Sequence, residues 1–457
     1  MKLVKSLLLG SAAGIAAVAG AQAADLPSRK AAPVEYVRVC TAYGAGFFYI
    51  PGTDSCLRIS GRVRAEYAVG ERYSDFQDAY GTRARGRLNV DVRTQTAYGT
   101  LRTFIRYELT NNTGIYASGT GPFNVGSNVP GLSRGPASSA TTSLLDLAFV
   151  QFGPITAGRA QSFFDFYASD LNFASIRTAD SRVNLLAYTA TFGSGFSATV
   201  SLEDRTSGTV GRELGGIIQD PVLFVNGGAA VTQGQDYPDL IASLRVDQGW
   251  GSAQLSGAVG QRNYATLANV AAVNGDEFAW AIQGGVKINL PSLAAGDALW
   301  LQAAYADGAL GYLGWSGGSF GLGRLGRLSL ADASINPVTG SIDNSTGWSL
   351  VAAFRHFWTP TIRTEISASY SELKLGYNDN SQLFLASRSL DPKEFLVAAN
   401  VIWSPVSGLD IGVEVLYSHL DVRAPVGVVS NANVRSGVLG IKSEDTLSGR
   451  LRIQRDF

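Results

Sequence analysis

The last residues of the chain alternate strictly between apolar and polar side chains. The apolar parity carries Leu447, Leu451 and Ile453, and the polar parity carries Ser448, Arg450, Arg452 and Gln454. A period of two residues is that of a β-strand with one apolar and one polar face. The pattern runs to the end of the sequence at Phe457. An aromatic end on such a strand is typical of a membrane β-barrel whose last strand pairs with its first.

The N-terminus predicts export. Lys2 and Lys5 precede an apolar stretch over residues 7–18, and Ala21-Gln22-Ala23 follows it. This order is that of a secretory signal peptide, so residues 1–23 are expected to be removed. The alternative is a retained anchor, but the apolar stretch is shorter than the about 20 residues that a membrane helix needs.

The composition favours a β-sheet with one polar, water-facing side and one apolar side. Lysine plus arginine number 37 and aspartate plus glutamate 37, so the mature chain is close to neutral, which argues against a nucleic-acid partner. Charged residues make up only 16% of the chain, and glycines number 53. After the N-terminus, no stretch is long and apolar enough for a membrane helix.

The two cysteines, Cys40 and Cys56, follow the expected signal peptide. In an exported chain they predict a disulfide that closes a short loop, worth about 3 kcal/mol by the loop-entropy estimate. No metal site is expected, because neither histidine lies near them and the sequence has no CxxC motif. Residues 24–56 therefore read as an N-terminal periplasmic segment that precedes the first long strand.

From residue 57 to 457 the chain reads as sixteen alternating segments. We expect strands near 57–69, 81–95, 98–110, 143–152, 155–162, 184–192, 196–204, 237–247, 251–262, 276–288, 298–306, 346–358, 361–373, 393–403, 408–420 and 445–457. Short Gly- and Pro-containing turns alternate with long loops. This asymmetry predicts an all-β, antiparallel transmembrane barrel in the outer membrane, with lipid around it and the short turns in the periplasm. A soluble propeller is the alternative, but no repeat of its length is found.

Arginine follows one parity in several of these segments. The inward set is predicted to be Arg58, Arg62, Arg64, Arg83, Arg85, Arg87, Arg93, Arg102, Arg106, Arg450 and Arg452. A charge that faces lipid at mid-membrane costs about 2–4 kcal/mol, so these side chains are expected to face water. Because the last strand closes on the first, they form one basic wall of an aqueous lumen.

The segment at about 163–183 is more aromatic than the other long loops. It carries Asp165, Asp170 and Asp180 among several phenylalanines. We expect this loop to fold inward, burying its aromatic rings and presenting its acids opposite the arginines. Opposed charges across an aperture orient and filter solutes by size and charge. The alternative is an external loop that caps the mouth or contacts a neighbouring subunit.

Several stretches resemble one family specifically. They are Gly20-Ala21-Gln22-Ala23-Ala24-Asp25, Glu35-Tyr36-Val37-Arg38-Val39-Cys40, Ile50-Pro51-Gly52-Thr53, Tyr107-Glu108-Leu109-Thr110 and Ala157-Gly158-Arg159-Ala160-Gln161-Ser162-Phe163-Phe164-Asp165-Phe166. With these the chain resembles the general porins of alphaproteobacteria such as Brucella and rhizobia. The resemblance implies a sixteen-stranded homotrimer, with the third external loop folded into the pore. It also implies passive diffusion of small hydrophilic solutes and ions, without a cofactor.

Three other functions are weighed against a general channel. A membrane-embedded hydrolase would need a nucleophile beside a base, but Ser418 and His419 are adjacent on a strand and point to opposite faces. A substrate-specific sugar channel would need a line of aromatic residues through the lumen, and most strand aromatics fall on the outward parity. The aromatic loop keeps the sugar channel open as an alternative. A gated transporter with a plug domain is disfavoured, because only residues 24–56 precede the first strand.

Overall fold

The structure is a computed structural model that places part of the chain. It describes residues 38–71, 78–118, 139–205, 230–232, 235–266, 274–315, 332–335, 342–375, 391–422 and 443–457. The expected signal peptide at 1–23 lies outside these residues. The chain forms two compact units, Met1–Cys56 and Leu57–Phe457. Within the described residues, every helix is too short or too polar to cross a bilayer.

The described part of the first unit is organised around a disulfide between Cys40 and Cys56, which confirms the predicted pair. Both cysteines are buried together with Phe47. A 3-10 turn, η1 (Thr41–Tyr43), follows Cys40, and the short strand β1 (Phe48–Tyr49) contains the partner of a bridge from Val39. With so few apolar side chains, this segment depends on the covalent link for its local order.

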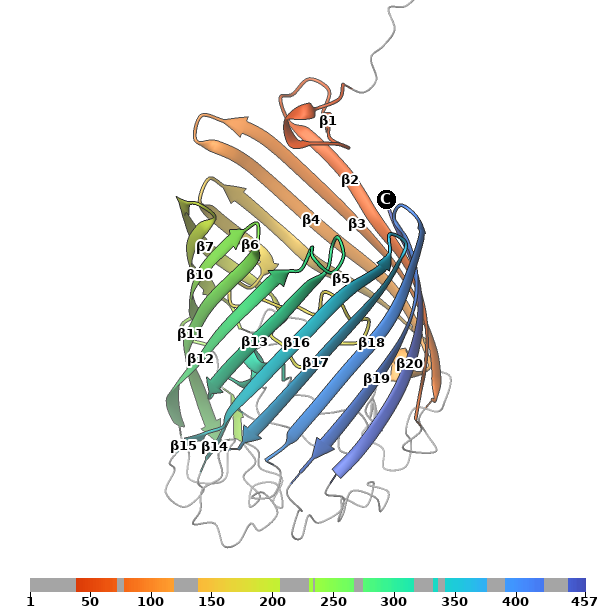
Figure 1. Ribbon diagram of the computed structural model, residues 1–457. Helices are drawn as coiled ribbons and strands as arrows, with labels where there is room; N and C mark the ends of the chain where they lie inside the picture. The colour runs from red at the N-terminus through yellow and green to blue at the C-terminus, as the bar shows by residue number, and fades with distance from the viewer. Residues whose placement is uncertain are drawn as a thin grey trace, which may run out of the picture. The chain divides into compact units, whose positions relative to one another are not determined.

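The second unit is a closed antiparallel barrel of sixteen long strands, as the sequence predicts. In chain order they are β2 (Cys56–Gly70), β3 (Tyr80–Thr96), β4 (Gly99–Thr113), β5 (Ser139–Phe152), β6 (Ile155–Gln161), β7 (Arg182–Gly193), β8 (Phe196–Glu203), β10 (Asp239–Gln248), β11 (Gly251–Thr266), β12 (Asn274–Asn289), β13 (Ala298–Asp307), β16 (Thr346–Thr359), β17 (Ile362–Lys374), β18 (Lys393–Val406), β19 (Leu409–Asp421) and β20 (Ser443–Asp456). Figure 1 shows them tilted around the barrel, with short turns at the rim that carries the C-terminus.

Shorter elements lie near the other ends of the strands. They are α2 (Ile115–Ser118), β9 (Ala230–Thr232), η2 (Leu310–Leu313), β14 (Ala333–Ile335) and β15 (Ile342–Asn344). Strand β9 pairs with the end of β11, and β14 pairs with β15. These elements therefore extend or cover the barrel at the rim of the long loops.

The barrel closes where β20 pairs with β2, from Arg62 opposite Asp456 to Gly70 opposite Ser448. Phe457 and Gly61 exchange two backbone hydrogen bonds at this seam. A Cβ atom at Gly61 would lie 2.5 Å from the Phe457 ring and 2.7 Å from a backbone oxygen of β3, so only glycine fits there. The aromatic terminus is thus part of the closure that the alternation predicted.

The two faces of the wall differ as a membrane barrel requires. On β2, Ile59, Val63 and Tyr67 are exposed on the outer face, whereas Glu66 and Ala68 are buried on the inner face. The outer face of the other strands repeats this apolar pattern. In water an apolar outer face would be unfavourable, so the natural surroundings of this surface are lipid.

Candidate functional site inside the barrel

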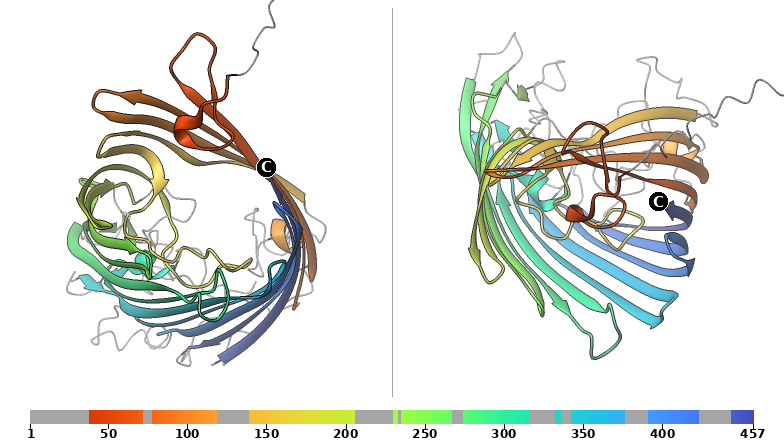
Figure 2. Two further views of the ribbon diagram at one scale, coloured as in Figure 1. Left: turned by 45° about the horizontal axis from the view of Figure 1, so that its top comes forward. Right: turned by 90° about the horizontal axis from the view of Figure 1, so that it is seen from above.

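The segment 162–181, which joins β6 to β7, runs through the lumen and contacts the inner wall along its length. Figure 2 (left) shows it in yellow inside the ring of strands. At its base the Phe163 N–H donates to Glu203 at 3.0 Å, and the Ser162 hydroxyl also donates to Glu203. Asp165 is buried here and accepts from the Ser181 N–H at 2.7 Å and from the Gln161 amide. The Asp165 carboxylate therefore closes the base of the loop.

The middle of this loop is packed against β11, β13 and β17. Phe164 and Tyr167 have no exposed surface. The Tyr167 N–H donates to Gln302 at 2.9 Å, and its hydroxyl lies 2.8 Å from the Ser367 hydroxyl. The Ser256 hydroxyl donates to the Phe164 carbonyl at 2.7 Å. The aromatic rings are thus buried against the wall, which explains why an otherwise polar loop carries them.

The tip of the loop is fixed to the opposite side of the lumen. Glu414 on β19 accepts the N–H groups of Phe173 and Ala174 at 2.6 and 2.7 Å. Arg450 and Arg452 on β20 each donate to the Phe173 carbonyl at 3.1 Å. The loop therefore spans from β6 and β7 to β19 and β20, and it divides the lumen.

A second inward segment, at 308–315, packs onto this loop. Its side chains Leu310, Tyr312, Leu313 and Trp315 are fully or almost fully buried. The Tyr312 ring meets the Phe164 ring edge-on with 4.6 Å between centroids. From the sequence these residues fall in the long connection between the strands expected at 298–306 and 346–358. The signal that could have found them is a cluster of apolar residues in a stretch otherwise rich in glycine and serine.

Arg177 links the two inward segments. Its guanidinium carbon lies 4.1 Å from the Trp315 ring centroid, and it also pairs with Glu394. Gly314 has φ +85°, and a Cβ there would lie 2.4 Å from the Thr178 nitrogen. Only glycine combines this backbone conformation with such close approach. The two segments therefore form one packed body on the inner side of β10–β19, and a cavity beside β2 and β20 is lined by Arg62, Arg64 and Arg452.

The predicted basic wall faces this open side. Arg62, Arg64, Arg83, Arg85, Arg87, Arg93, Arg102, Arg106, Arg450 and Arg452 lie on the inner face of β2, β3, β4 and β20 and are partly buried. Arg58 is exposed near the start of β2. The eleven arginines thus share one face of neighbouring strands, and Arg62, Arg64 and Arg452 among them line a cavity inside the barrel.

Carboxylates that are not among the predicted site residues lie between these arginines. Glu66, buried on β2, pairs with Arg452 at 2.7 Å and with Arg83 at 3.6 Å. Glu108 on β4 pairs with Arg85 at 3.3 Å and also with Arg87. Both acids lie on the inward parity of their strands, so parity could have identified them. The wall is a guanidinium-rich network with embedded counter-charges.

The remaining loop acids differ in their surroundings. Asp170 is exposed near the loop tip, and Asp180 pairs with Arg182 at the loop base. Arg182 also lies 3.4 Å from Asp146, which pairs with Arg106 of the basic wall. Reduced solvation in the lumen raises the pKa of Asp170, and the Asp180 charge adds to this effect. Burial raises the pKa of Asp180 as well, although Arg182 opposes the shift.

Two cavities lie between the loop and the rim of short turns. One, of about 430 Å³, has Arg64, Asp170 and Arg355 in its lining. The other, of about 570 Å³, also contacts Asp170 and continues toward the turn after β10. Space therefore continues on the short-turn side of the loop, where charged side chains of both signs line it.

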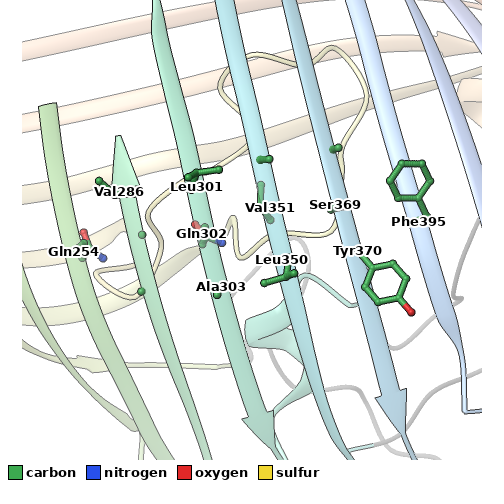
Figure 3. Close-up of a pocket in the computed structure, with 14 residues that line it drawn as sticks. Gln254, Val286, Leu301, Gln302, Ala303, Leu350, Val351, Ser369, Tyr370 and Phe395 are labelled. Carbon is green, nitrogen blue, oxygen red and sulfur yellow. The ribbon is translucent and has the colours of Figure 1, made fainter. Parts of the chain in front are cut away.

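A third hollow, of about 700 Å³, lies in the wall across β11, β12, β13, β16, β17 and β18 (Figure 3). Leu301, Leu350 and Phe395 line it and are exposed on the outer face. Figure 3 looks at this face, with the inward loop behind the strands. The hollow therefore belongs to the lipid-facing surface and not to the path through the lumen.

Comparison with known proteins points to one family. The model of the porin subfamily matches residues 25–449. Porin Omp2b of Brucella canis is 35% identical over 315 residues, which cover 67% of this chain and 75% of that porin, and Porin Omp2b of Brucella melitensis matches to the same extent. The outer membrane channel DcaP of Acinetobacter baumannii is similar with a TM-score of 0.59 at 16% identity, covering 90% of this chain and 99% of DcaP. At that identity the likeness to DcaP shows the fold alone.

Proposed function

The chain belongs to the porin subfamily and is a β-barrel channel of the outer membrane, not an enzyme. From the interior of this barrel we propose which solutes the channel conducts and how it selects them. The channel carries small hydrophilic solutes and ions by passive diffusion through a water-filled lumen. The passage between the inward loop and the arginine-rich wall filters them by size and charge. The observation that carries this proposal is the fixed loop: Glu414 holds its tip across the lumen, opposite the base at β6 and β7.

The charge filter rests on the two loop acids that border open space. Asp170 is exposed at the tip, and Asp180 is half-buried and connects through Arg182 to the wall. Asp165 instead acts at the loop base, because its carboxylate is buried among its donors. Guanidiniums of β2–β4 and β20 supply the opposite charge. A field across the passage orients dipolar solutes and slows those of the wrong charge.

The assembly and the domain layout belong to the same proposal. Residues 1–23 act as a cleaved signal peptide, 24–56 form a periplasmic segment held by the disulfide, and 57–457 form the barrel, with its constriction at about 163–183. The barrel is surrounded by outer-membrane lipid and assembles as a homotrimer. The resemblance to general porins supports the trimer, and the exposed apolar outer face offers a surface for both contacts.

Reversal potentials in a salt gradient test the charge filter. Replacing both Asp170 and Asp180 with Asn is expected to shift selectivity toward anions, because the loop then lacks its accessible negative charges. Replacing Arg62, Arg83 and Arg85 together with Gln is expected to shift it toward cations. An unchanged reversal potential in the Asn variant would remove the loop acids from the filter, and an unchanged value in the Gln variant would remove that part of the wall.

A further inference from the structure

Three inward side chains on adjacent strands form a compact group near the rim of short turns. Lys287 on β12 pairs directly with Trp300 on β13, and Arg355 on β16 lies diagonally from Trp300, opposite Ala298. The Lys287 Nζ lies 5.0 Å from the Trp300 ring centroid, and the Arg355 guanidinium carbon lies 5.6 Å from it. Two cations therefore converge on one indole ring that is 7% exposed.

These two cations differ from the other charged groups around them. In the same cavities Arg245 pairs with Asp247, and Arg363 pairs with Glu365 and Asp410. Among the described residues, neither Lys287 nor Arg355 forms an ion pair with a carboxylate, and Arg355 instead donates to a backbone carbonyl at 3.2 Å.

The surroundings of Lys287 and Arg355 favour the binding of an anionic solute. Asp170 lines both cavities and acts electrostatically on both cations. Asp247 also acts on Lys287, and Asp297 and Glu365 also act on Arg355. Arg64 lines the smaller cavity too, and its guanidinium donates to Gln454 at 2.9 Å. The lining of the smaller cavity contains six cationic side chains and four carboxylates, so its local charge is positive: Arg62, Arg64, Lys287, Arg355, Arg363 and Arg452 against Asp170, Glu365, Asp410 and Asp456.

We propose that Lys287, Trp300 and Arg355 form a binding subsite for the oxyanion of a small solute, a carboxylate or a phosphate, on the short-turn side of the loop. The ammonium and the guanidinium supply charge-assisted donors to one oxyanion. The indole holds both cations in place, so less ordering is needed when the anion arrives. The proposal rests on the proposed function, because it places the subsite in the conduction path.

Asp170 keeps this subsite weak. A carboxylate in the same cavity repels an arriving anion, so the anion is held briefly and then released. Conduction requires binding that is favourable enough for entry and weak enough for exit. The loop acid and the two cations thus act on the same solute in opposite directions.

Planar-bilayer recordings of the full-length channel test the subsite. The KCl current is measured while inorganic phosphate is titrated, and the concentration that halves the current is determined; sodium acetate replaces phosphate in a second arm. Wild-type protein is expected to show a saturable decrease. Lys287→Gln and Arg355→Gln should each raise the half-blocking concentration about tenfold, because each removes a charged donor. Lys287→Arg, which keeps the charge, should stay close to wild type.

Arg245→Gln is the matched control, since it removes one positive charge from the larger cavity, which Lys287 also lines, at a residue that is not part of the proposed subsite. Its half-blocking concentration should change by less than about twofold. An equal shift in Arg245→Gln would show that only the general field matters and would overturn the subsite, as would wild-type current that falls linearly without saturation. A block by one anion alone would assign the site to that anion. Absence of any KCl current from folded protein would instead contradict the proposed channel itself.

Discussion

Removal of the Glu414 carboxylate should release the tip of the inward loop. Glu414 is 2% exposed and accepts N–H groups from Phe173 at 2.6 Å and Ala174 at 2.7 Å. A third donor, the Asn400 amide, lies 3.3 Å from the same carboxylate. Glu414→Ala removes the acceptor for two adjacent backbone donors and leaves the rest of the loop in contact with the wall.

The magnitude follows from these two bonds. Hydrogen bonds to a charged group contribute about 1.5–3 kcal/mol each, so the pair contributes about 3–6 kcal/mol before solvent is considered. Water in the lumen can satisfy the released N–H groups, which reduces the loss to about 2–4 kcal/mol. At 1.4 kcal/mol per factor of ten, the ratio of attached to detached tips should fall about 30- to 700-fold.

Single-channel recording measures this change. Glu414→Ala should show a larger mean conductance and more open-channel noise, because the tip moves in and out of the passage. Glu414→Gln should be intermediate, since its amide oxygen still accepts a neutral hydrogen bond. Glu372→Ala is the control. Glu372 lies near the C-terminal end of β17, where it pairs with Lys393, and its replacement should leave the conductance unchanged. Wild-type conductance and noise in Glu414→Ala would refute the assignment of Glu414 as the anchor.

Three further outcomes are expected. Because the pKa values of Asp170 and Asp180 are raised, both carboxylates lose their charge at a higher pH than the usual about 3.9, so anion preference should grow on acidification before ordinary carboxylates titrate. Reversal potentials across pH check this, and the step should be missing when both are Asn. Trp315→Ala should destabilise the folded barrel by about 3–5 kcal/mol, measured by thermal unfolding in detergent, because it empties a fully buried site; an unchanged midpoint would contradict the packed second segment. Serine at both Cys40 and Cys56 should speed limited proteolysis of the first unit and leave the conductance unchanged, since both cysteines belong to that unit and neither lines the lumen cavities; a changed conductance would tie that unit to the passage.

The strands were predictable because a barrel wall imposes one simple rule on every segment. Each residue faces either lipid or the lumen, so apolar and polar side chains alternate along a strand. Ile59 and Val63 on the outer face of β2, with Arg62 and Arg64 on the inner face, show how completely the two environments separate. Glycine and proline at the short turns supplied the boundaries.

The interior was less predictable, because contacts between distant segments decide it. Parity placed the arginines inside, but the pairing of Glu66 with Arg452 depends on closure of the barrel, which joins residues from its two ends. Asp165 has the same residue type as Asp170, and only its donors at the loop base give it a different role. The packing of Trp315 under Arg177 likewise has no local sequence period. Such roles follow from three-dimensional proximity and not from pattern.

The central claim is an open, water-filled passage narrowed by a fixed inward loop, and single-channel conductance of the purified wild-type protein in a planar bilayer tests it most directly. The structure predicts large ohmic steps whose size rises in proportion to KCl concentration, with steady open levels because both ends of the loop are anchored. Correctly folded protein that gives no steps would mean that the two inward segments close the lumen, and the account would be wrong.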